Sequence, residues 1–305
     1  MNEYIPHIPA KLKVPLNMNG MSGRMLYLPA KKSGQKQTLV VYGYYSNLER
    51  MYNYAYVLNR YGSVVVPDLP GFGGMQSFYT INKRPSLDNL ADYIASLIKL
   101  KFKRGPITLV GFSFGFAVVT RMLQKYPEIS KRTELVISVG GFAHYKDINL
   151  SKSERRIYKM LARLLSLRLP AAIARPIALN KTVLSRLSQD KYLNDKGLSK
   201  AQKIEASKFN TKSWHDTHLR TYAYTNTELL RLNNCLAPID SRLWHLSLKT
   251  DTFLRKKIVK QHLRSIYGEV NCASLRPRKQ NIGQIISTRD ISAMLPRELK
   301  RQLSK

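Results

Sequence analysis

One stretch of the sequence decides the fold, Ile107-Thr108-Leu109-Val110-Gly111-Phe112-Ser113-Phe114-Gly115. Its apolar first part follows a Gly-Pro pair and is typical of a short buried strand. The Gly-x-Ser-x-Gly part predicts a sharp turn from that strand into a helix, in which the glycines leave room for the crowded backbone. Ser113 is therefore a candidate nucleophile, and the amide of Phe114 can point at a developing oxyanion. A buried serine in a glycine-rich turn is the alternative interpretation.

Short β-rich runs alternate with longer helical patterns on both sides of this stretch. That alternation is typical of a mostly parallel sheet with helices on both faces, the α/β class. We expect strands near residues 38–42, 63–66, 107–110, 134–139, 242–248 and 269–273, and helices near 50–60, 87–98, 252–267 and 291–303.

The strand pattern disappears between residues 144 and 239. This block contains an apolar stripe at helical spacing, formed by Ile157, Met160, Leu161, Leu164 and Leu165, and it indicates a helical insertion before the penultimate strand. We therefore expect a core made of residues 1–143 and 240–305 and a helical cap made of residues 144–239. The stripe either packs inside the protein or favours an apolar acyl or alcohol part of a substrate.

The net charge of +32 is spread along the chain. Residues 1–143, 144–239 and 240–305 carry 18, 18 and 15 basic side chains against 7, 7 and 5 acidic ones. A platform for stacking nucleic-acid bases would interleave a basic run with aromatic residues, and no such run occurs. Solvated lysine and arginine side chains explain this distribution, and no specific nucleic-acid binding is expected. Weak attraction to an anionic membrane surface or to other anions is the alternative.

The sequence indicates neither a cofactor nor a metal. Cys235 and Cys272 lie outside any Cys-x-x-Cys or Cys-His spacing, so a zinc site and a disulfide framework are not expected. No stretch approaches the roughly 18 apolar residues of a membrane-spanning helix. The first residues, Met1 to Pro9, lack the basic and apolar blocks of a secretory signal. We therefore expect a cytoplasmic protein.

In this order of elements the sequence resembles the α/β-hydrolase family over most of residues 38–300. Gly111 to Gly115 is similar to the family's nucleophile elbow. Tyr42-Gly43-Tyr44-Tyr45 lies where the family usually has His-Gly followed by an oxyanion-hole residue, and Asp68-Leu69-Pro70-Gly71-Phe72-Gly73 is similar to its Asp-x-x-Gly-x-Gly turn. The resemblance implies that the backbone amides of Tyr44 and Phe114 form the oxyanion hole.

The resemblance also implies a catalytic acid just after the strand that follows the cap. Asp251 occupies that place, with capping of a helix from Thr252 as the alternative role. The family's catalytic histidine should follow the last strand, near residues 276–286, but no histidine occurs beyond His262.

Other histidines of the sequence are candidates for the base. His245 and His262 should lie roughly 20 Å and 16 Å from the reactive edge, too far to act. His144 follows the strand next to the elbow, at the edge where ligands bind in open α/β sheets, and is the favoured candidate. His215 and His218 could reach down from the cap, although a surface or packing role is the alternative for all three. As a metal pair these two lack a third ligand.

The resemblance implies a serine hydrolase that acts on a small ester, thioester or related acyl substrate through a Ser113 acyl-enzyme. In this interpretation Asp251 orients His144, which takes the proton of Ser113. The alternative is a catalytically impaired member of the same fold with a binding or interaction role, because a serine hydroxyl without a base is a poor nucleophile.

Overall fold

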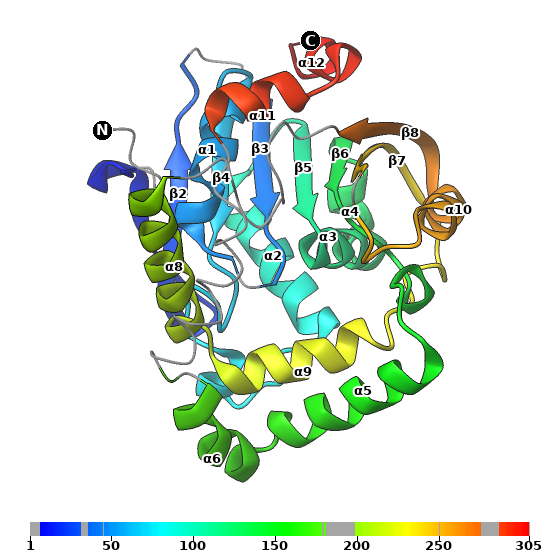
Figure 1. Ribbon diagram of the computed structural model, residues 1–305. Coiled ribbons are helices and arrows are strands. Elements are labelled where there is room, and N and C mark those ends of the chain that lie inside the picture. The colour runs from blue at the N-terminus through cyan, green and yellow to red at the C-terminus, as the bar shows by residue number, and fades with distance from the viewer. Residues whose placement is uncertain are drawn as a thin grey trace.

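The computed structural model describes residues 7–31, 36–44, 46–178, 180, 199–249, 251–275 and 287–304. Within them the chain forms an eight-stranded sheet with the order β1-β2-β4-β3-β5-β6-β7-β8. The strands are β1 Lys13–Met18, β2 Met21–Leu28, β3 Lys36–Val41, β4 Gly62–Pro67, β5 Ile107–Phe112, β6 Thr133–Val139, β7 Ile239–Leu248 and β8 Tyr267–Leu275. Only the pairs β1–β2 and β2–β4 are antiparallel. The prediction of a mostly parallel α/β sheet is confirmed (Figure 1).

The antiparallel hairpin at the edge of the sheet was not predicted. Asn19 and Gly20 join β1 to β2 with φ angles of 54° and 76°, as a two-residue hairpin turn requires. The Asn-Gly dipeptide was the available signal. Gly23 lets β2 pass close to Met75, because a Cβ there would lie 2.8 Å from the Met75 Cα.

Helices cover both faces of the sheet. They are α1 Leu48–Leu58, α2 Leu87–Lys101, α3 Phe114–Lys125, α4 Pro127–Ser130, α5 Lys152–Ser166, α6 Arg168–Ala178, α8 Lys200–His215, α9 Leu219–Leu229, α10 Lys256–Ile266, α11 Thr288–Met294 and α12 Arg297–Ser304, with 3₁₀ turns η1 Ala10–Leu12, η2 Phe78–Ile81 and η3 Tyr145–Asp147. The single helix expected over residues 291–303 is two helices, because Pro296 lies between them and restricts the residue before it.

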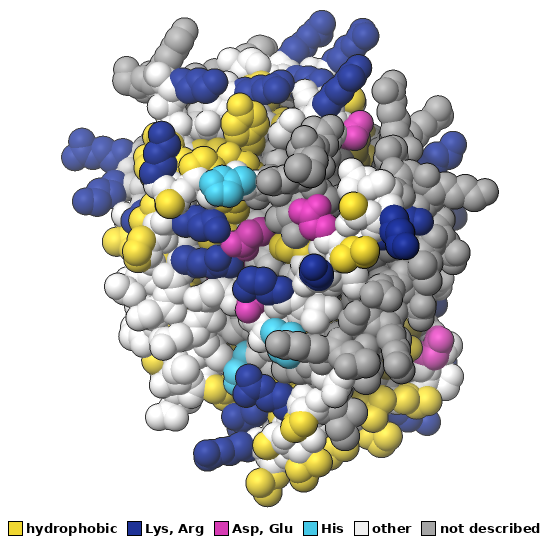
Figure 2. All heavy atoms as spheres, turned by 60° about the vertical axis from the view of Figure 1, so that its left-hand side comes forward, with side chains coloured by type: hydrophobic (Ala, Val, Ile, Leu, Met, Phe, Trp, Pro, Cys, Tyr) yellow, Lys and Arg dark blue, Asp and Glu magenta, His cyan; other side chains and the backbone are white. Residues whose placement is uncertain are grey.

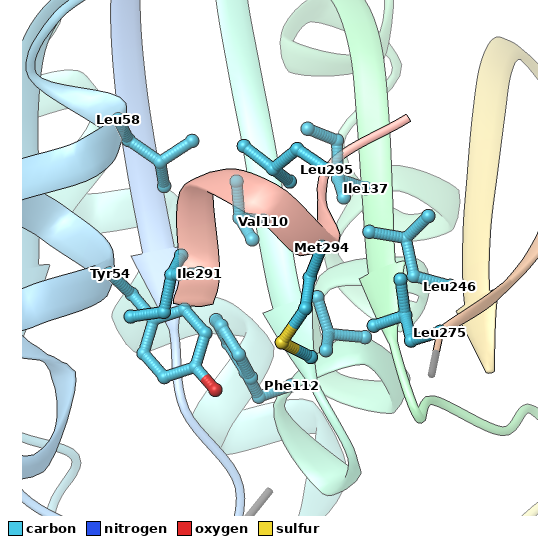
Figure 3. A pocket seen from close by; sticks show the side chains of 11 residues that line it. Tyr54, Leu58, Val110, Phe112, Ile137, Leu246, Leu275, Ile291, Met294 and Leu295 are labelled. Carbon is cyan, nitrogen blue, oxygen red and sulfur yellow. The ribbon is translucent and has the colours of Figure 1, made fainter. Parts of the chain in front are cut away.

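Strand β5 shows how the two faces are filled. Val110 and Phe112 line a small apolar cavity of about 30 Å³ together with residues of α1 and α11, such as Tyr54 and Met294 (Figure 3). Gly111 points to the opposite face, where a Cβ would lie 2.4 Å from the Cα of Phe116 in α3. Since side chains alternate along a strand, α1 and α11 cover one face and α3 the other. The cavity is a packing void beneath α11.

Helices α5, α6, α8 and α9 lie between β6 and β7, where the sequence placed the insertion. Figure 1 shows the arrowheads of β3 and β5 pointing toward the side of the molecule on which α9 and α5 lie. The division of the chain into a core and a cap stays a prediction.

The interpretation of the apolar stripe on α5 as core packing is wrong for four of its five residues, and its contact with an apolar part of a substrate stays a prediction. Ile157, Met160, Leu161 and Leu164 are 52%, 62%, 45% and 50% exposed. Helix α5 instead packs on α9 through its opposite side, where Ala162 is buried.

No helix in the described part of the chain is long and apolar enough to cross a membrane. The same residues contain no group of three or more His, Cys, Asp or Glu side chains placed to hold a metal ion.

Candidate active site

The backbone at Ser113 is strained. Its φ is 49° and its ψ is −120°, a conformation that costs energy for a residue with a Cβ. The Ser113 amide donates to the Val139 carbonyl of β6 at 3.0 Å, and the Ser113 carbonyl accepts from Phe116 at 3.1 Å as α3 begins. The turn therefore connects β5 to α3 within one residue. The Ser113 side chain, which has no hydrogen-bond partner among the described residues, is only partly buried.

The second glycine of the motif, Gly115, is required because a side chain has no room there. A Cβ on Gly115 would lie 2.3 Å from the Val41 carbonyl oxygen and 2.4 Å from that of Tyr42. Neither oxygen can move without shifting the end of β3, so α3 can approach the sheet only with glycine at this position.

We expect Gly115→Ala to lower the free energy of unfolding by about 3 kcal/mol, as overpacking against backbone does. Gly268→Ala in β8 is the matched control, because its Cβ would meet only Asp240 Oδ1 at 4.0 Å; it should change stability by less than about 0.5 kcal/mol. Urea unfolding of both variants measures the difference. Equal stability of the two variants would contradict the close approach at Gly115.

The loop after β3 lies directly against the elbow. A Cβ on Gly43 would be 2.9 Å from the Ser113 Cβ and 3.2 Å from the Phe114 nitrogen. The next ring, that of Tyr44, stacks on Phe114 with centroids 4.4 Å apart and planes 12° apart. Among the hydrogen bonds of the described residues, the amides of Tyr44 and Phe114 donate to no protein acceptor. The two predicted oxyanion-hole residues thus lie side by side next to Ser113; their catalytic role stays a prediction.

Tyr44 is held in place by the insertion. Its hydroxyl donates to the Thr225 carbonyl of α9, and its ring meets Tyr222 edge-on with centroids 5.9 Å apart. Burial raises the pKa of Tyr44 well above its usual value, so the phenol is neutral and remains a donor. Helix α9 therefore contributes directly to the surroundings of Ser113.

Asp68 organises the turn after β4. It is fully buried and accepts hydrogen bonds from Arg24 Nε at 2.7 Å, the Tyr42 hydroxyl at 2.8 Å and the Gly74 amide at 2.7 Å. Burial raises the pKa of Asp68 to about 6, against the lowering effect of Arg24 and of these hydrogen bonds, so the side chain is ionised above pH 7. Gly73, with a φ of 59°, closes the turn. Asp68 has a structural role at the edge of the site.

His144 begins η3 and uses its ring as a cap. Its Nδ1 accepts the amide of Lys146 at 3.1 Å, so the neutral ring carries its proton on Nε2. Burial, and next the nearby His262, lower the pKa of His144, which favours the neutral ring. The ring packs against that of His262 with centroids 4.5 Å apart. The structure thus places the His144 ring against the His262 ring of α10. In its neutral form, the His144 ring can donate a proton from Nε2 but cannot accept one there.

Asp251 caps a turn. Its Oδ1 accepts the amides of Phe253 at 2.8 Å and Leu254 at 3.4 Å. Helix α10 begins at Lys256, so Asp251 does not cap a helix starting at Thr252 as the alternative required. In the described residues no hydrogen bond joins Asp251 to a histidine, and the predicted pair of Asp251 with His144 is not formed. Residues 276–286, where the family's histidine was expected, lie outside the described residues.

The two cap histidines differ in their surroundings. His215 ends α8 with its side chain exposed. His218 caps α9, its Nδ1 accepting the Thr221 amide at 3.2 Å, and its own amide donates to the Gly71 carbonyl at 2.8 Å. Burial is the first cause that lowers the pKa of His218. Its ring therefore has the same tautomer as that of His144.

The structure contains an acid and histidine pair that the sequence analysis missed. Asp147 is fully buried, and its Oδ1 lies 2.5 Å from Nδ1 of His262. A carboxylate only accepts, so Nδ1 of His262 is the donor of this hydrogen bond. The other oxygen of Asp147 accepts the amides of Ala143 and His144 at 2.9 Å each. The two partners are 115 positions apart in sequence, and no local pattern signals the contact.

Three comparisons with known proteins concern the fold of the whole chain. A family model described as "alpha/beta hydrolase fold" matches residues 38–220. No curated protein matches the chain. Solved structures of low identity match it over most of its length.

Three of these structures illustrate the match. A hydrolase from Pseudomonas aeruginosa PA01 has 14% identity and a TM-score of 0.65, with 88% of this chain and 91% of that chain covered. A thermophilic esterase from Thermogutta terrifontis has 16% identity and a TM-score of 0.61, with 96% and 99% covered. The enol-lactonase from Burkholderia xenovorans LB400 has 13% identity and a TM-score of 0.63, with 86% and 91% covered. At these identities the likeness establishes the fold.

Proposed function

The chain belongs to the alpha/beta hydrolase fold family, and on that basis we propose that it is a serine hydrolase that cleaves a small acyl substrate through Ser113. The observation that carries the proposal is the backbone of Ser113, with a φ of 49° at the junction of β5 and α3. Packing of the Ser113 side chain does not require this strained backbone. Exposure of a nucleophile at the edge of the sheet does require it.

The surroundings of Ser113 favour an acyl group. The adjacent amides of Phe114 and Tyr44 can donate to the oxyanion that forms when a hydroxyl attacks a carbonyl. Tyr44, Phe114, Phe72 and Tyr222 supply aromatic surfaces around them, with the centroids of Phe72 and Tyr44 6.3 Å apart. The names of two structural neighbours, an esterase and an enol-lactonase, describe enzymes of acyl compounds. We therefore propose an ester, thioester or related acyl compound as the substrate class.

In the proposed reaction Ser113 Oγ bonds to the acyl carbon while His144 takes the hydroxyl proton. The bond to the leaving oxygen or sulfur then breaks, and the leaving atom receives that proton. Water attacks the acyl-serine in the second step, which restores Ser113 and releases the acid. His144 Nε2 can act as the base only after the ring proton moves to Nδ1. This change gives up the hydrogen bond from Lys146, a cost of about 1 kcal/mol.

We expect His144→Gln to lower kcat/KM by about a hundredfold or more, as loss of a general base does. His218→Gln is the matched control, because His218 caps α9 through Nδ1 and also has a lowered pKa; its loss should leave turnover nearly unchanged. Burial lowers the pKa of His144, and the base must be unprotonated to act. On the acid side, the midpoint of the pH profile of kcat/KM for the wild type should therefore lie below about pH 6.5. Unchanged turnover in the His144 variant would remove this residue from the mechanism.

A second function is favoured by one observation. Within the described residues no hydrogen bond connects Ser113 with a histidine, and residues 276–286 contain none. A member of the fold without a working base would bind its ligand and turn it over negligibly.

Labelling with a fluorophosphonate probe separates the two functions. The hydrolase function requires that the probe labels the purified protein covalently and that the protein hydrolyses short-chain or medium-chain p-nitrophenyl esters. A protein that is inert to both at every pH supports the binding function.

A further inference from the structure

Helices α5 and α6 present an apolar face to solvent. We define this apolar face as Ile157, Met160, Leu164, Leu167, Leu169 and Ile173, whose exposures lie between 50% and 74%. We propose that the apolar face docks on a membrane surface that contains anionic phospholipid. Figure 2 shows hydrophobic side chains gathered at the lower end of the molecule, the end at which Figure 1 places α5 and α6.

The apolar face points away from the protein. Residues advance by about 100° around a helix, so Ile157, Met160 and Leu164 share one side of α5. The partly or fully buried positions Arg155, Lys159 and Ala162 share the opposite side, which faces α9. Helix α5 therefore packs through its more polar side and exposes its more apolar one. That reversal is unfavourable in water and is typical of a helix that lies in a membrane interface.

The charges beside the apolar face select the partner. Helices α5 and α6 carry two lysines and five arginines against a single acidic residue, Glu154, and all of these basic residues except Arg155 and Lys159 are exposed. Their residues are Lys152–Ser166 and Arg168–Ala178. Basic side chains flanking an apolar stripe favour anionic headgroups. In a two-fold dimer through this face, the basic side chains of one copy would face the same basic side chains of the other. Each copy also carries a net charge of +32, so dimerisation through this face is disfavoured.

A basic hollow opens beside the apolar face. It has a volume of about 560 Å³ and is lined by Tyr79, Asn82, Lys83, Arg84, Arg168 and Arg220. Arg168 is also the first residue of α6, between Leu167 and Leu169 of the apolar face. In the described part of the chain none of the four basic residues makes an ion pair with an acidic side chain. Planar guanidinium groups with free donors are suited to phosphate oxygens.

Arg220 is oriented before any ligand arrives. Its Nε donates to the Ser166 carbonyl at the end of α5 at 3.3 Å, and its guanidinium lies 3.9 Å from the centroid of the Tyr79 ring. These contacts link the basic hollow to the end of α5. A phospholipid headgroup in the hollow would thus lie next to Arg168, which is flanked by Leu167 and Leu169 of the apolar face.

Co-sedimentation with vesicles tests the proposal. The full chain is mixed with phosphatidylcholine vesicles that contain or lack phosphatidylglycerol, at low and high salt. We expect binding only to the anionic vesicles, weaker but still measurable at high salt because the apolar contact is not screened. The double variant Met160→Asp, Leu164→Asp should reduce binding more than about tenfold. Leu236→Asp is the matched control, since Leu236 is 75% exposed and lies outside α5 and α6.

A second pair of variants tests the basic hollow. Arg84→Gln combined with Arg168→Gln should weaken binding by roughly fivefold for each arginine. Arg60→Gln combined with Arg104→Gln changes the net charge equally at exposed positions outside the hollow and should have a smaller effect. Circular-dichroism melting verifies that all variants are folded.

Three results would overturn the proposal. The first is equal binding of the wild type and the Met160, Leu164 variant, or no binding of the wild type. The second is displacement of a fluorescent anion from the hollow by inorganic phosphate without any binding to vesicles, which would indicate a site for a free anion. The third is a dimer, detected by sedimentation velocity, that the Met160, Leu164 variant dissociates.

Discussion

Ser113→Ala is expected to abolish fluorophosphonate labelling and to reduce ester hydrolysis to the rate that binding and the oxyanion hole alone provide. In complete triads the loss of the nucleophile costs on the order of a millionfold in kcat. The tautomer change of His144 costs the wild type about 1 kcal/mol, which is roughly fivefold in rate. We therefore expect Ser113→Ala to lower kcat by roughly a hundred-thousandfold. Labelling followed by intact-mass measurement, together with p-nitrophenyl ester kinetics, tests this.

The variant should keep its fold. The Ser113 hydroxyl makes no hydrogen bond to any described residue. Alanine has a Cβ as serine does, so it should tolerate the φ of 49° at this position equally well. Ser46→Ala is the matched control, because the Ser46 hydroxyl is buried and has no hydrogen-bond partner; its labelling should equal that of the wild type. If the Ser113 variant labels as fast as the Ser46 variant, the nucleophile is another residue.

Asp68→Ala is expected to lower the free energy of unfolding by about 3 to 5 kcal/mol. The substitution leaves the buried Tyr42 hydroxyl without its acceptor, and also the Gly74 amide and one donor of Arg24. Arg24 keeps its two hydrogen bonds to Glu49, at 2.8 Å and 2.9 Å, which limits the loss. Urea unfolding followed by fluorescence measures the change.

A surface ion pair provides the comparison for Asp68. Asp88 pairs with Arg121 at 2.6 Å, but their side chains are 49% and 34% exposed. Asp88→Ala should therefore cost less than about 1 kcal/mol. The interpretation of Asp68 as the organiser of the turn fails if the two variants lose similar stability.

The sequence predicted the sheet well because its strands are short and almost fully apolar. In β5 all six residues are buried, and such runs separated by amphipathic helices are typical of parallel sheets. The hairpin of β1 and β2 was missed although Asn19-Gly20 is a turn signal. Its strands alternate less regularly, with two partly buried residues, Gly23 and Arg24, in the middle of β2.

The sequence predicted those parts of the candidate site whose positions depend on the course of the backbone. Gly43, Tyr44, Ser113 and Phe114 follow β3 and β5, which are parallel neighbours, so their meeting at one sheet edge follows from topology. The histidines were not predictable in the same way. Their roles depend on which ring nitrogen accepts a hydrogen bond, and for His144 that partner is the amide of Lys146.

The sequence by itself determined the family, the mostly parallel sheet and the place of Ser113, because these follow from local hydrophobic periodicity and from a turn that glycine permits. Tertiary structure alone decided that Asp147 meets His262, that Asp251 caps a turn, and that α5 exposes Ile157, Met160 and Leu164. Each of these depends on which side chains two distant segments bring into contact. A helical stripe has the same period whether it faces the core, a substrate or a membrane; packing against α9 decides which.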